Sequence, residues 1–315
     1  NQLRWQTERP LEHTANEAVR RADTDPANPL RASVRSDPAG ARTNARDNTP
    51  AVVHMEVVPG DRLEVFVAAK GGGSENKARF AMLNPSDSIV DWVLAQVPTM
   101  GGDWCPPGML GLGIGGTPEK AMGMAKQALF EEPINLHELR SRGPRNRLEA
   151  LRLEIHDKVN ALGIGAQGLG GLTTVLDVKI RDFPTHASSL PVAMIPNCAA
   201  TRHVHFTLDG EGPAVFTPPP LSEWPAIDYR PGPGARRVNL DTLTREEVAG
   251  FRAGDQLLLN GKLLTGRDAA HKRLADLIAR NEPLPVDFRN RVIYYVGPVD
   301  PVGKEVVGPA GPTTA

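Results

Sequence analysis

The chain has 315 residues, 40% of them hydrophobic and 23% charged, which is typical of a soluble globular protein of about two domains. Its 36 Lys and Arg residues against 37 Asp and Glu residues give a net charge of -1, which excludes binding of nucleic acid or an anionic membrane by bulk charge. Two cysteines exclude a disulfide scaffold, and without an apolar run of about 18 residues no membrane-spanning helix is expected.

Hydrophobic periodicity and turn residues predict a mixed α/β first part. Ser86 and Thr117 are the expected N-caps of two of its helices, and Gly163 is expected to end a third. In chain order, we expect a helix over 11–22, two strands within 51–69, helices over 86–97, from Pro118 onward and over 146–162, and strands over 172–180 and 190–195.

A proline-rich stretch over 217–236 has no sustained periodicity and is interpreted as a linker. We therefore expect a first domain over 1–220, a linker over 221–236 and a second domain over 237–315. The second domain is expected to be a compact α/β unit with a short helix near 244–251, a helix over 268–280 and a buried strand near 291–299. The chain starts without Met or a signal peptide and stops in a Gly-, Pro- and Thr-rich run, so we expect a fragment.

The 31 glycines gather in three places, at 71–73, 111–116 and 163–171, which favours a site built from loops. The run at 71–73 is compatible with a flexible turn or with a backbone cradle for an anion. The run at 111–116 departs from the dinucleotide pattern G-x-G-x-x-G and lacks the Lys-Ser/Thr ending of a phosphate loop. A helix N-terminus that faces a carboxylate or a cluster fits this second run better.

Two cysteines and a few polar residues could carry chemistry. Cys105 and Cys198 each lie at a strand or loop end beside prolines or small residues, so each thiol could reach a cavity. Two buried structural thiols explain the same pattern, and a metal site or a nucleophile is the alternative. His186, Arg31 and Arg267 are compatible either with surface positions or with a site, where an arginine can bind a carboxylate bidentately.

Five segments together resemble class I fumarate hydratase, the oxygen-sensitive iron–sulfur family that is closely similar to L-tartrate dehydratase. They are KGGGSENKARFAMLNPSDSIVDWV, CPPGMLGLGIGGTPEKAM, PVAMIPNCAATRHVHF, GDQLLLNGKLLTGRDAAHKR and VGPAGPTT, which occur in the family's order. The resemblance covers the chain from about Leu11 to Ala315.

The resemblance implies a 4Fe-4S cluster held by three cysteine thiolates, with one iron open to substrate. Cys105 and Cys198 match two of these ligands. The third lies in a Cys-Gln-Asp-Thr-Gly motif, with an acid–base Asp, that would precede Asn1. The 315 residues therefore lack one of the three cysteine ligands of the cluster, and this chain alone is expected to be inactive.

The resemblance also implies the residues that meet the substrate. Arg31 and Arg267 match arginines that bind its carboxylates, and the turn at Gly71 matches a backbone contact. Thr313 matches a threonine that transfers the C3 proton, and His186 matches a histidine paired with the catalytic aspartate. An Arg and a Lys that follow this threonine in the family would lie beyond Ala315.

The resemblance implies an N-terminal α/β cluster-binding domain and a C-terminal swivelling β/β/α domain, in a homodimer of the cytoplasm or an organelle. The expected activity is reversible hydration of fumarate to L-malate, and fusion of the two domains favours this over L-tartrate dehydration. Another hydroxy-dicarboxylate is a further alternative. A non-catalytic iron–sulfur or oxygen-sensing protein is a third reading, favoured only if the natural chain begins at Asn1.

Overall fold

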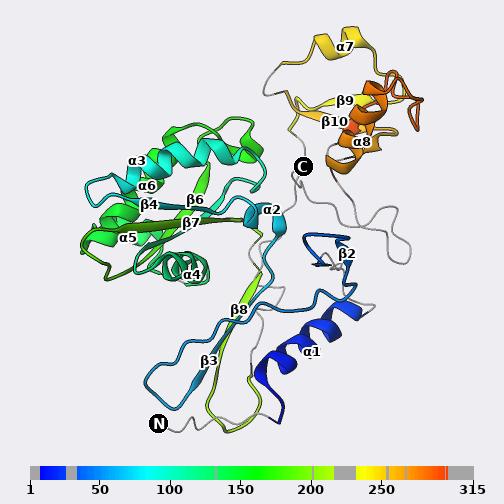
Figure 1. Cartoon of the computed structure of the whole chain (residues 1–315). Coiled ribbons are helices and arrows are strands. Elements are labelled where there is room, and N and C mark those ends of the chain that lie inside the picture. The colour runs from blue at the N-terminus through cyan, green and yellow to red at the C-terminus, as the bar shows by residue number, and fades with distance from the viewer. Residues whose placement is uncertain are drawn as a thin grey trace. The chain divides into compact units, whose positions relative to one another are not determined.

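The computed structural model describes residues 8–25, 34–131, 133–200, 202–215, 232–252, 255–266, 268–294 and 296. Internal contacts divide the chain into two units, residues 1–65 with 205–217 and residues 66–204 with 218–315. Helices and strands alternate along the chain, which confirms the expected mixed α/β class (Figure 1). The expected linker falls mostly on residues outside the described ranges, so the boundaries at 220 and 237 stay predictions.

A four-stranded sheet in the order β4–β7–β5–β6 organises the part of the chain between residues 79 and 198. β5 runs parallel to β6 and antiparallel to β7, and β4 is antiparallel to β7. The strands are β4 (Arg79–Leu83), β5 (Gly108–Gly115), β6 (Val175–Phe183) and β7 (Leu190–Cys198). Consequently the first residues of β5 and β6 share one end of the sheet with the last residue of β7.

Helices cover both faces of this sheet (Figure 1). α3 (Ile89–Gln96) and α6 (Arg147–Ala161) bury Leu110 and Leu112 of β5, while α4 (Pro118–Ala128) buries Ala193 and Ile195 of β7 on the opposite face. Successive residues of a strand point to opposite faces of the sheet, so each strand contributes side chains to the hydrophobic core on both faces. Burial of each such large aliphatic side chain contributes roughly 1.5–3 kcal/mol.

Glycines on β5 allow α4 to approach the sheet closely. A Cβ at Gly111 would overlap the carbonyl oxygen of Ala125, and a Cβ at Gly113 would overlap that of Ala121. Because the helix backbone occupies the space of the missing side chains, these glycines are required by packing.

The first unit is built from short elements. It contains α1 (Leu11–Thr24), β1 (Arg35–Ser36) and β2 (Thr43–Asn44), and β3 (Leu63–Ala68) pairs with β8 (His203–Leu208) in a two-stranded sheet. The helix expected over 11–22 is therefore confirmed. Of the two strands expected within 51–69, only β3 forms, because residues 51–58 have no partner strand in the described chain and expose Val52 and Val57 to solvent.

The C-terminal part contains two short parallel strand pairs and two helices. β9 (Arg236–Asn239) pairs with β10 (Leu257–Asn260), and β11 (Leu264–Thr265) pairs with β12 (Ile293–Tyr294). α7 (Arg245–Ala249) begins with a capping box between Thr244 and Glu247, and α8 (Asp268–Ala279) agrees with the expected helix. Of the strand expected near 291–299, β12 forms with Ile293 and Tyr294 exposed, whereas Val296 is buried. Residues 295 and 297–299 lie outside the described ranges.

Helix starts depend on details that the sequence leaves open. α3 begins after Ser88, whose hydroxyl accepts the N–H of Asp91, so the expected cap at Ser86 is wrong. Thr117 occupies the N-cap position of α4, but its hydroxyl bonds Glu119 Oε1 at 2.6 Å. Elements without a sequence prediction include β1, β2, α2 (Gly72–Glu75), β4, α5 (Leu136–Arg142), β8 and the 3-10 turns η1 (Val97–Met100) and η2 (Ala166–Gly168).

Candidate functional site

The register of the sheet brings the two cysteines to one end of it. Gly108, the first residue of β5, is the Cα partner of Cys198, the last residue of β7, and Cys105 lies three residues before Gly108. Both cysteines are thiols with partly buried side chains. We call this end of the sheet, where β5 begins and β7 ends, the cysteine end.

Cys105 has an unusual backbone conformation. Its φ of 59° lies in the left-handed region, which costs a residue with a side chain roughly 1–2 kcal/mol. Its N–H bonds the carbonyl of Gly102 at 2.9 Å. Strain of this kind persists only where surrounding structure holds it, and it is concentrated at functional sites.

The loop with Cys105 (residues 101–107, the Cys105 loop) is braced by the third glycine run. The N–H of Gln167 donates to the carbonyl of Pro106 at 2.7 Å. A Cβ at Gly102 would overlap the carbonyl oxygen of Gln167, so the two loops are in close contact. The glycines at 163–171 therefore serve the cysteine end as scaffold.

The first glycine run forms the start of a single helical turn at the cysteine end. Gly71 is the N-cap of α2, which packs against β7, and the hydroxyl of Ser74 donates to the Gly71 carbonyl at 3.1 Å. A Cβ at Gly71 or Gly72 would meet no atom within 4 Å. Packing in the described chain does not require these glycines, which leaves their backbone open to close approach by a ligand.

Three lysines and two acids tie the segments of this end together. Lys70 Nζ lies 2.9 Å from Glu75 Oε2 and donates to Ser74 Oγ at 2.9 Å. Lys126, in the last turn of α4, pairs with the same carboxylate. Lys77 pairs with Asp103 of the Cys105 loop, so the glycine turn is joined to both α4 and that loop.

Burial and charge shape the ionisation of this cluster. Burial lowers the pKa of Lys70, although Glu75 and the neighbouring Cys198 act in the opposite direction. Burial opposes ionisation of Glu75, but the ammonium groups of Lys126 and Lys70 outweigh it and lower the pKa of that carboxyl. The ionised form of Glu75 is therefore favoured, and its carboxylate is shared between the two lysines.

His186 lies at the opposite end of the sheet. It occupies the turn between β6 and β7, where Ser188 Oγ is 2.8 Å from its Nδ1. β7 runs from this turn to Cys198, and its nine residues span roughly 26 Å at the usual rise of a strand. Within one copy of the chain, the structure does not bring His186 to the cysteines.

The second glycine run also belongs to this far end. β5 runs from the cysteine end to Gly115, so α4 begins at Pro118 on the side of Thr185, whose hydroxyl donates to the Gly116 carbonyl at 3.0 Å. Within one copy of the chain, the strand therefore carries the N-terminus of this helix away from the cysteines, and it does not face a cluster held by them. The alternative, that it faces a carboxylate, stays a prediction.

The other predicted site residues, Arg31, Arg267 and Thr313, lie outside the described residues. The sequence analysis did not identify Lys70, Glu75, Lys77 and Lys126 as part of the site. The available signal was a pair of lysines within a glycine-rich, polar stretch. Lys126, which shares the carboxylate of Glu75 with Lys70, is remote in sequence.

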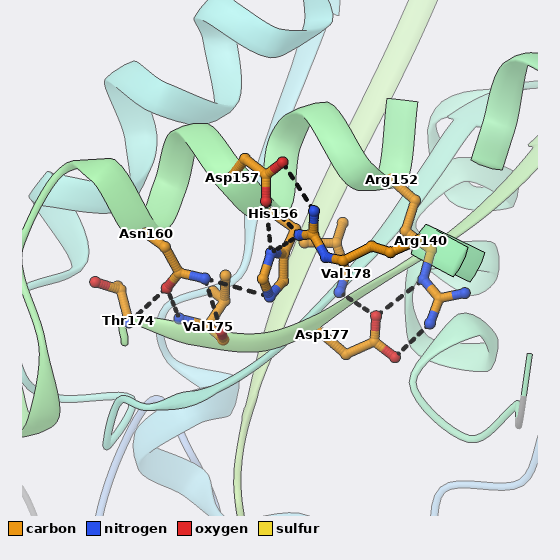
Figure 2. Close-up of polar contacts among 9 residues, drawn as sticks. All are labelled: Arg140, Arg152, His156, Asp157, Asn160, Thr174, Val175, Asp177 and Val178. Carbon is orange, nitrogen blue, oxygen red and sulfur yellow. Dashed lines mark hydrogen bonds and ion pairs between the residues drawn. The ribbon is translucent and has the colours of Figure 1, made fainter. Parts of the chain in front are cut away.

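A polar network between α6 and β6 was also missed (Figure 2). Arg152 of α6, only 4% exposed, donates to both oxygens of Asp177 at 2.9 and 2.8 Å and to the carbonyl of Ile134 at 2.7 Å. Asn160, near the end of α6, bonds the backbone of Thr174 and Val175. The network fixes α6 to the edge strand β6.

The donor groups at the cysteine end are the thiols of Cys105 and Cys198. They are of the type that binds iron–sulfur clusters, but they are fewer than the three thiolates that the resemblance implies. Thiolates are the usual ligands of iron–sulfur clusters, and two cysteines face the same end of one sheet. Among residues in the described ranges, no group of three or more His, Cys, Asp or Glu side chains is arranged for a metal ion. The residues present therefore fit two positions of a three-thiolate site. No helix within those ranges is long and apolar enough to cross a bilayer.

Comparison with known proteins gives the same family across both halves of the chain. A family model described as fumarate hydratase (fumerase) matches residues 1–207, and one described as fumarase C-terminus matches residues 210–315. The chain is 30% identical over 295 residues to the anaerobic class I fumarate hydratase of Escherichia coli K12, which covers 86% of this chain and 52% of that protein.

Two further relatives bear on the substrate. Fumarate hydratase 2 of Leishmania major is 30% identical over 294 residues, covering 86% of this chain and 50% of the relative. A putative L(+)-tartrate dehydratase subunit alpha of Methanocaldococcus jannaschii is 39% identical over 168 residues, covering 51% of this chain and 56% of the relative. The chain thus spans about half the length of the curated relatives it matches.

Proposed function

The chain belongs to the fumarate hydratase (fumerase) family, and on that premise we propose that it takes part in the reversible hydration of fumarate to L-malate. The reaction class is that of a carbon–oxygen hydro-lyase, the class to which fumarate hydratases such as these relatives belong. The observation that carries the proposal is the pairing of Gly108 with Cys198, which gathers two cysteines and the Gly71 turn at one sheet end.

Cys105 and Cys198 are the residues of this chain that would hold a 4Fe-4S cluster, together with a third thiolate. When bound, such a cluster supplies an open iron that acts as a Lewis acid toward the substrate hydroxyl. The partial burial of both thiols and the braced, left-handed backbone at Cys105 support this assignment.

The chain's own groups bind and orient the substrate in this proposal. The open backbone at Gly71 lets a carboxylate approach closely, and the lysine–carboxylate cluster around Glu75 fixes the turn in place. Arg31 and Arg267 are proposed to bind the two carboxylates through bidentate guanidinium contacts, which would orient the reacting double bond.

Thr313 and His186 are the proposed proton-transfer residues. A threonine hydroxyl is a weak base at neutral pH, so neighbouring cations must favour its ionised form. We assign His186 its role from the resemblance alone, since the whole of β7, roughly 26 Å at the usual strand rise, lies between its turn and Cys198.

We also propose the larger organisation that the family resemblance implies. The first domain (1–220) would bind the cluster, residues 221–236 would link the domains, and the second domain (237–315) would swivel over the substrate. The two family matches, over 1–207 and 210–315, support a junction in this part of the chain. A homodimer located in the cytoplasm completes the proposal.

L-tartrate dehydration is the second candidate. The tartrate dehydratase subunit is more similar to this chain than the fumarate hydratases over the residues it covers, at 39% against 30% identity. The fumarate hydratases nevertheless match 86% of the chain, against 51% for that subunit, and we therefore favour fumarate.

The natural protein that contains this chain, with its cluster reconstituted anaerobically, allows a direct test. Fumarate hydration and L-tartrate dehydration would be assayed side by side, before and after exposure to air. We expect fumarate turnover that is lost in air. Turnover of tartrate alone would transfer the proposal to the second candidate, and turnover of neither substrate at full cluster content would refute the hydro-lyase.

A further inference from the structure

Asn160 makes an unusually complete set of hydrogen bonds at the end of α6 (Figure 2). Its Oδ1 accepts the N–H groups of Thr174 at 2.7 Å and Val175 at 2.9 Å. Its Nδ2 donates to the carbonyl of Val175 at 3.1 Å and lies 3.2 Å from Nε2 of His156. The amide thereby fastens α6 to the first residues of β6.

These contacts close the base of the loop that joins α6 to β6 (residues 163–173, here the glycine loop). Thr174 is fully buried, and its Oγ1 accepts the N–H of Gly165 at 3.0 Å. Within the loop, the N–H of Gly170 donates to Ile164 at 2.7 Å and that of Gly171 to Gly163 at 3.1 Å. Glycines with positive φ gain no rigidity from side chains, so this loop depends on its hydrogen bonds for shape.

The glycine loop and the adjoining Thr174 hold the Cys105 loop at its proline pair and at the residue that follows it. The N–H of Gln167 donates to the Pro106 carbonyl at 2.7 Å, and the N–H of Gly108 donates to the Thr174 carbonyl at 3.3 Å. The strained conformation of Cys105 is therefore supported by a segment whose base Asn160 fastens. Cys198 meets this segment through its pairing with Gly108, but it ends the central strand β7, which is paired along its length with both β4 and β5 and so has support that does not depend on Asn160.

We propose that Asn160 is a positioning residue for Cys105: its amide fixes the glycine loop, and the glycine loop fixes the backbone that aims this thiol. The consequence for catalysis rests on the proposed function. The positioning itself is testable without turnover, because Cys198 serves as an internal reference in the same molecule.

The test measures the alkylation rates of Cys105 and Cys198 by iodoacetamide in the whole reduced, metal-free chain, with each modified peptide quantified by mass spectrometry. For Asn160→Ala we expect Cys105 to react about tenfold faster, because buried N–H groups lose their acceptor and the loop opens locally. Cys198 should change by less than about twofold, since β7 keeps its pairing.

Asn146→Ala is the matched control. Asn146 caps the other end of the same helix by accepting the N–H of Glu149 at 2.9 Å, a bond that does not involve the glycine loop. Loss of this cap should leave the ratio of the two rates unchanged. Asn160→Asp keeps the acceptor for Thr174 and Val175 but replaces the donor to the Val175 carbonyl with an oxygen, so its ratio should rise less than that of Asn160→Ala.

Thr174→Val provides an independent variant in case Asn160→Ala does not fold. It preserves the buried shape but removes the acceptor of the Gly165 N–H, and it should also raise the Cys105 rate selectively. An unchanged ratio in the folded variants, or an equal rise for both thiols, would overturn the proposal. A selective rise in a protein that turns over no dicarboxylate would support the positioning while refuting the proposed function.

Discussion

Gly108 and Cys198 are Cα partners across β5 and β7, and this one pairing determines that the two cysteines share a sheet end. The antiparallel direction of β7 matters as much as the register. It places Cys198 beside the start of β5 and sends the turn with His186 to the opposite end. The candidate site thus follows from strand order and direction, combined with a loop that precedes β5.

The close packing of α4 on β5 predicts opposite effects for two Gly→Ala substitutions. Gly113→Ala would force a methyl group into the carbonyl of Ala121 and should lower the free energy of unfolding by about 1–3 kcal/mol or more. Gly123→Ala, inside α4 with no atom within 4 Å of the new Cβ, should raise it by about 0.5–1 kcal/mol. Urea unfolding measures both, and a neutral Gly113→Ala would refute the close approach.

The buried ion pair between Arg152 and Asp177 should be important for stability. Arg152→Lys cannot reproduce the bidentate contact and leaves Asp177 poorly paired, so we expect a loss of about 3 kcal/mol in the free energy of unfolding. Arg140→Lys alters an exposed pair with Asp157 and should cost less than about 1 kcal/mol. Thermal unfolding of both variants is the measurement, and equal effects would contradict the argument.

The left-handed backbone at Cys105 predicts a conflict between stability and function. Cys105→Gly should be more stable than Cys105→Ala by about 1 kcal/mol, because glycine adopts a φ of 59° without steric cost. Neither variant would supply a thiolate. Denaturant midpoints of the two variants are compared directly, and an Ala variant as stable as the Gly variant would show that the residue is unstrained.

The shared carboxylate of Glu75 predicts a local electrostatic effect. Glu75→Gln would leave Lys70 and Lys126 without a common counter-charge, and the Gly71 turn should become less ordered. Because Glu75 is 43% exposed and solvent screens the pair, we expect only about 1 kcal/mol of lost stability. Because the Gly71 turn is proposed to bind a substrate carboxylate, the factor by which KM for fumarate rises should exceed the factor by which kcat falls. Glu154→Gln, which breaks an exposed pair with Lys158, is the control and should leave KM unchanged.

Acid sensitivity should depend on Glu149. The side chain of Arg142 and the backbone N–H of Arg145 lower its pKa from 4.5 to about 2. A folded-state pKa below the unfolded value stabilises the protein above the unfolded pKa, and this contribution disappears as the pH falls from 4.5 to about 2. The stability difference between the natural chain and Glu149→Gln should therefore shrink across this window. Parallel curves of urea midpoint against pH would contradict the assignment.

The sequence was sufficient where the signal was local. The helices over 11–22 and 146–162 were predicted because their periodicity ends at Asp25 and Gly163, and both form close to those limits. The choice between Ser86 and Ser88 as a cap could not be made, since it depends on which hydroxyl reaches the N–H of Asp91. Residues 51–58 alternate like a strand, but alternation does not supply a partner strand.

The arrangement of the site was beyond local signals. The sequence predicted Cys105, Cys198 and Gly71 as site residues, and the fold brings these three to one sheet end. His186 is only twelve residues from Cys198, yet β7 spans the distance between them as an extended strand. Lys126 and Asn160 were missed because their partners, Glu75 and Thr174, lie on other elements that only tertiary packing brings near.

The most direct test is cluster assembly in the natural protein that contains this chain, with and without Cys198→Ala. Both proteins would be reconstituted anaerobically, and iron and sulfide per chain would be measured beside the far-UV circular dichroism. We predict a cluster in the natural protein and none in the variant, with the same secondary structure in both. Equal iron and sulfide in the two proteins would contradict the assignment of Cys198 as a ligand and, with it, the account of the cysteine end.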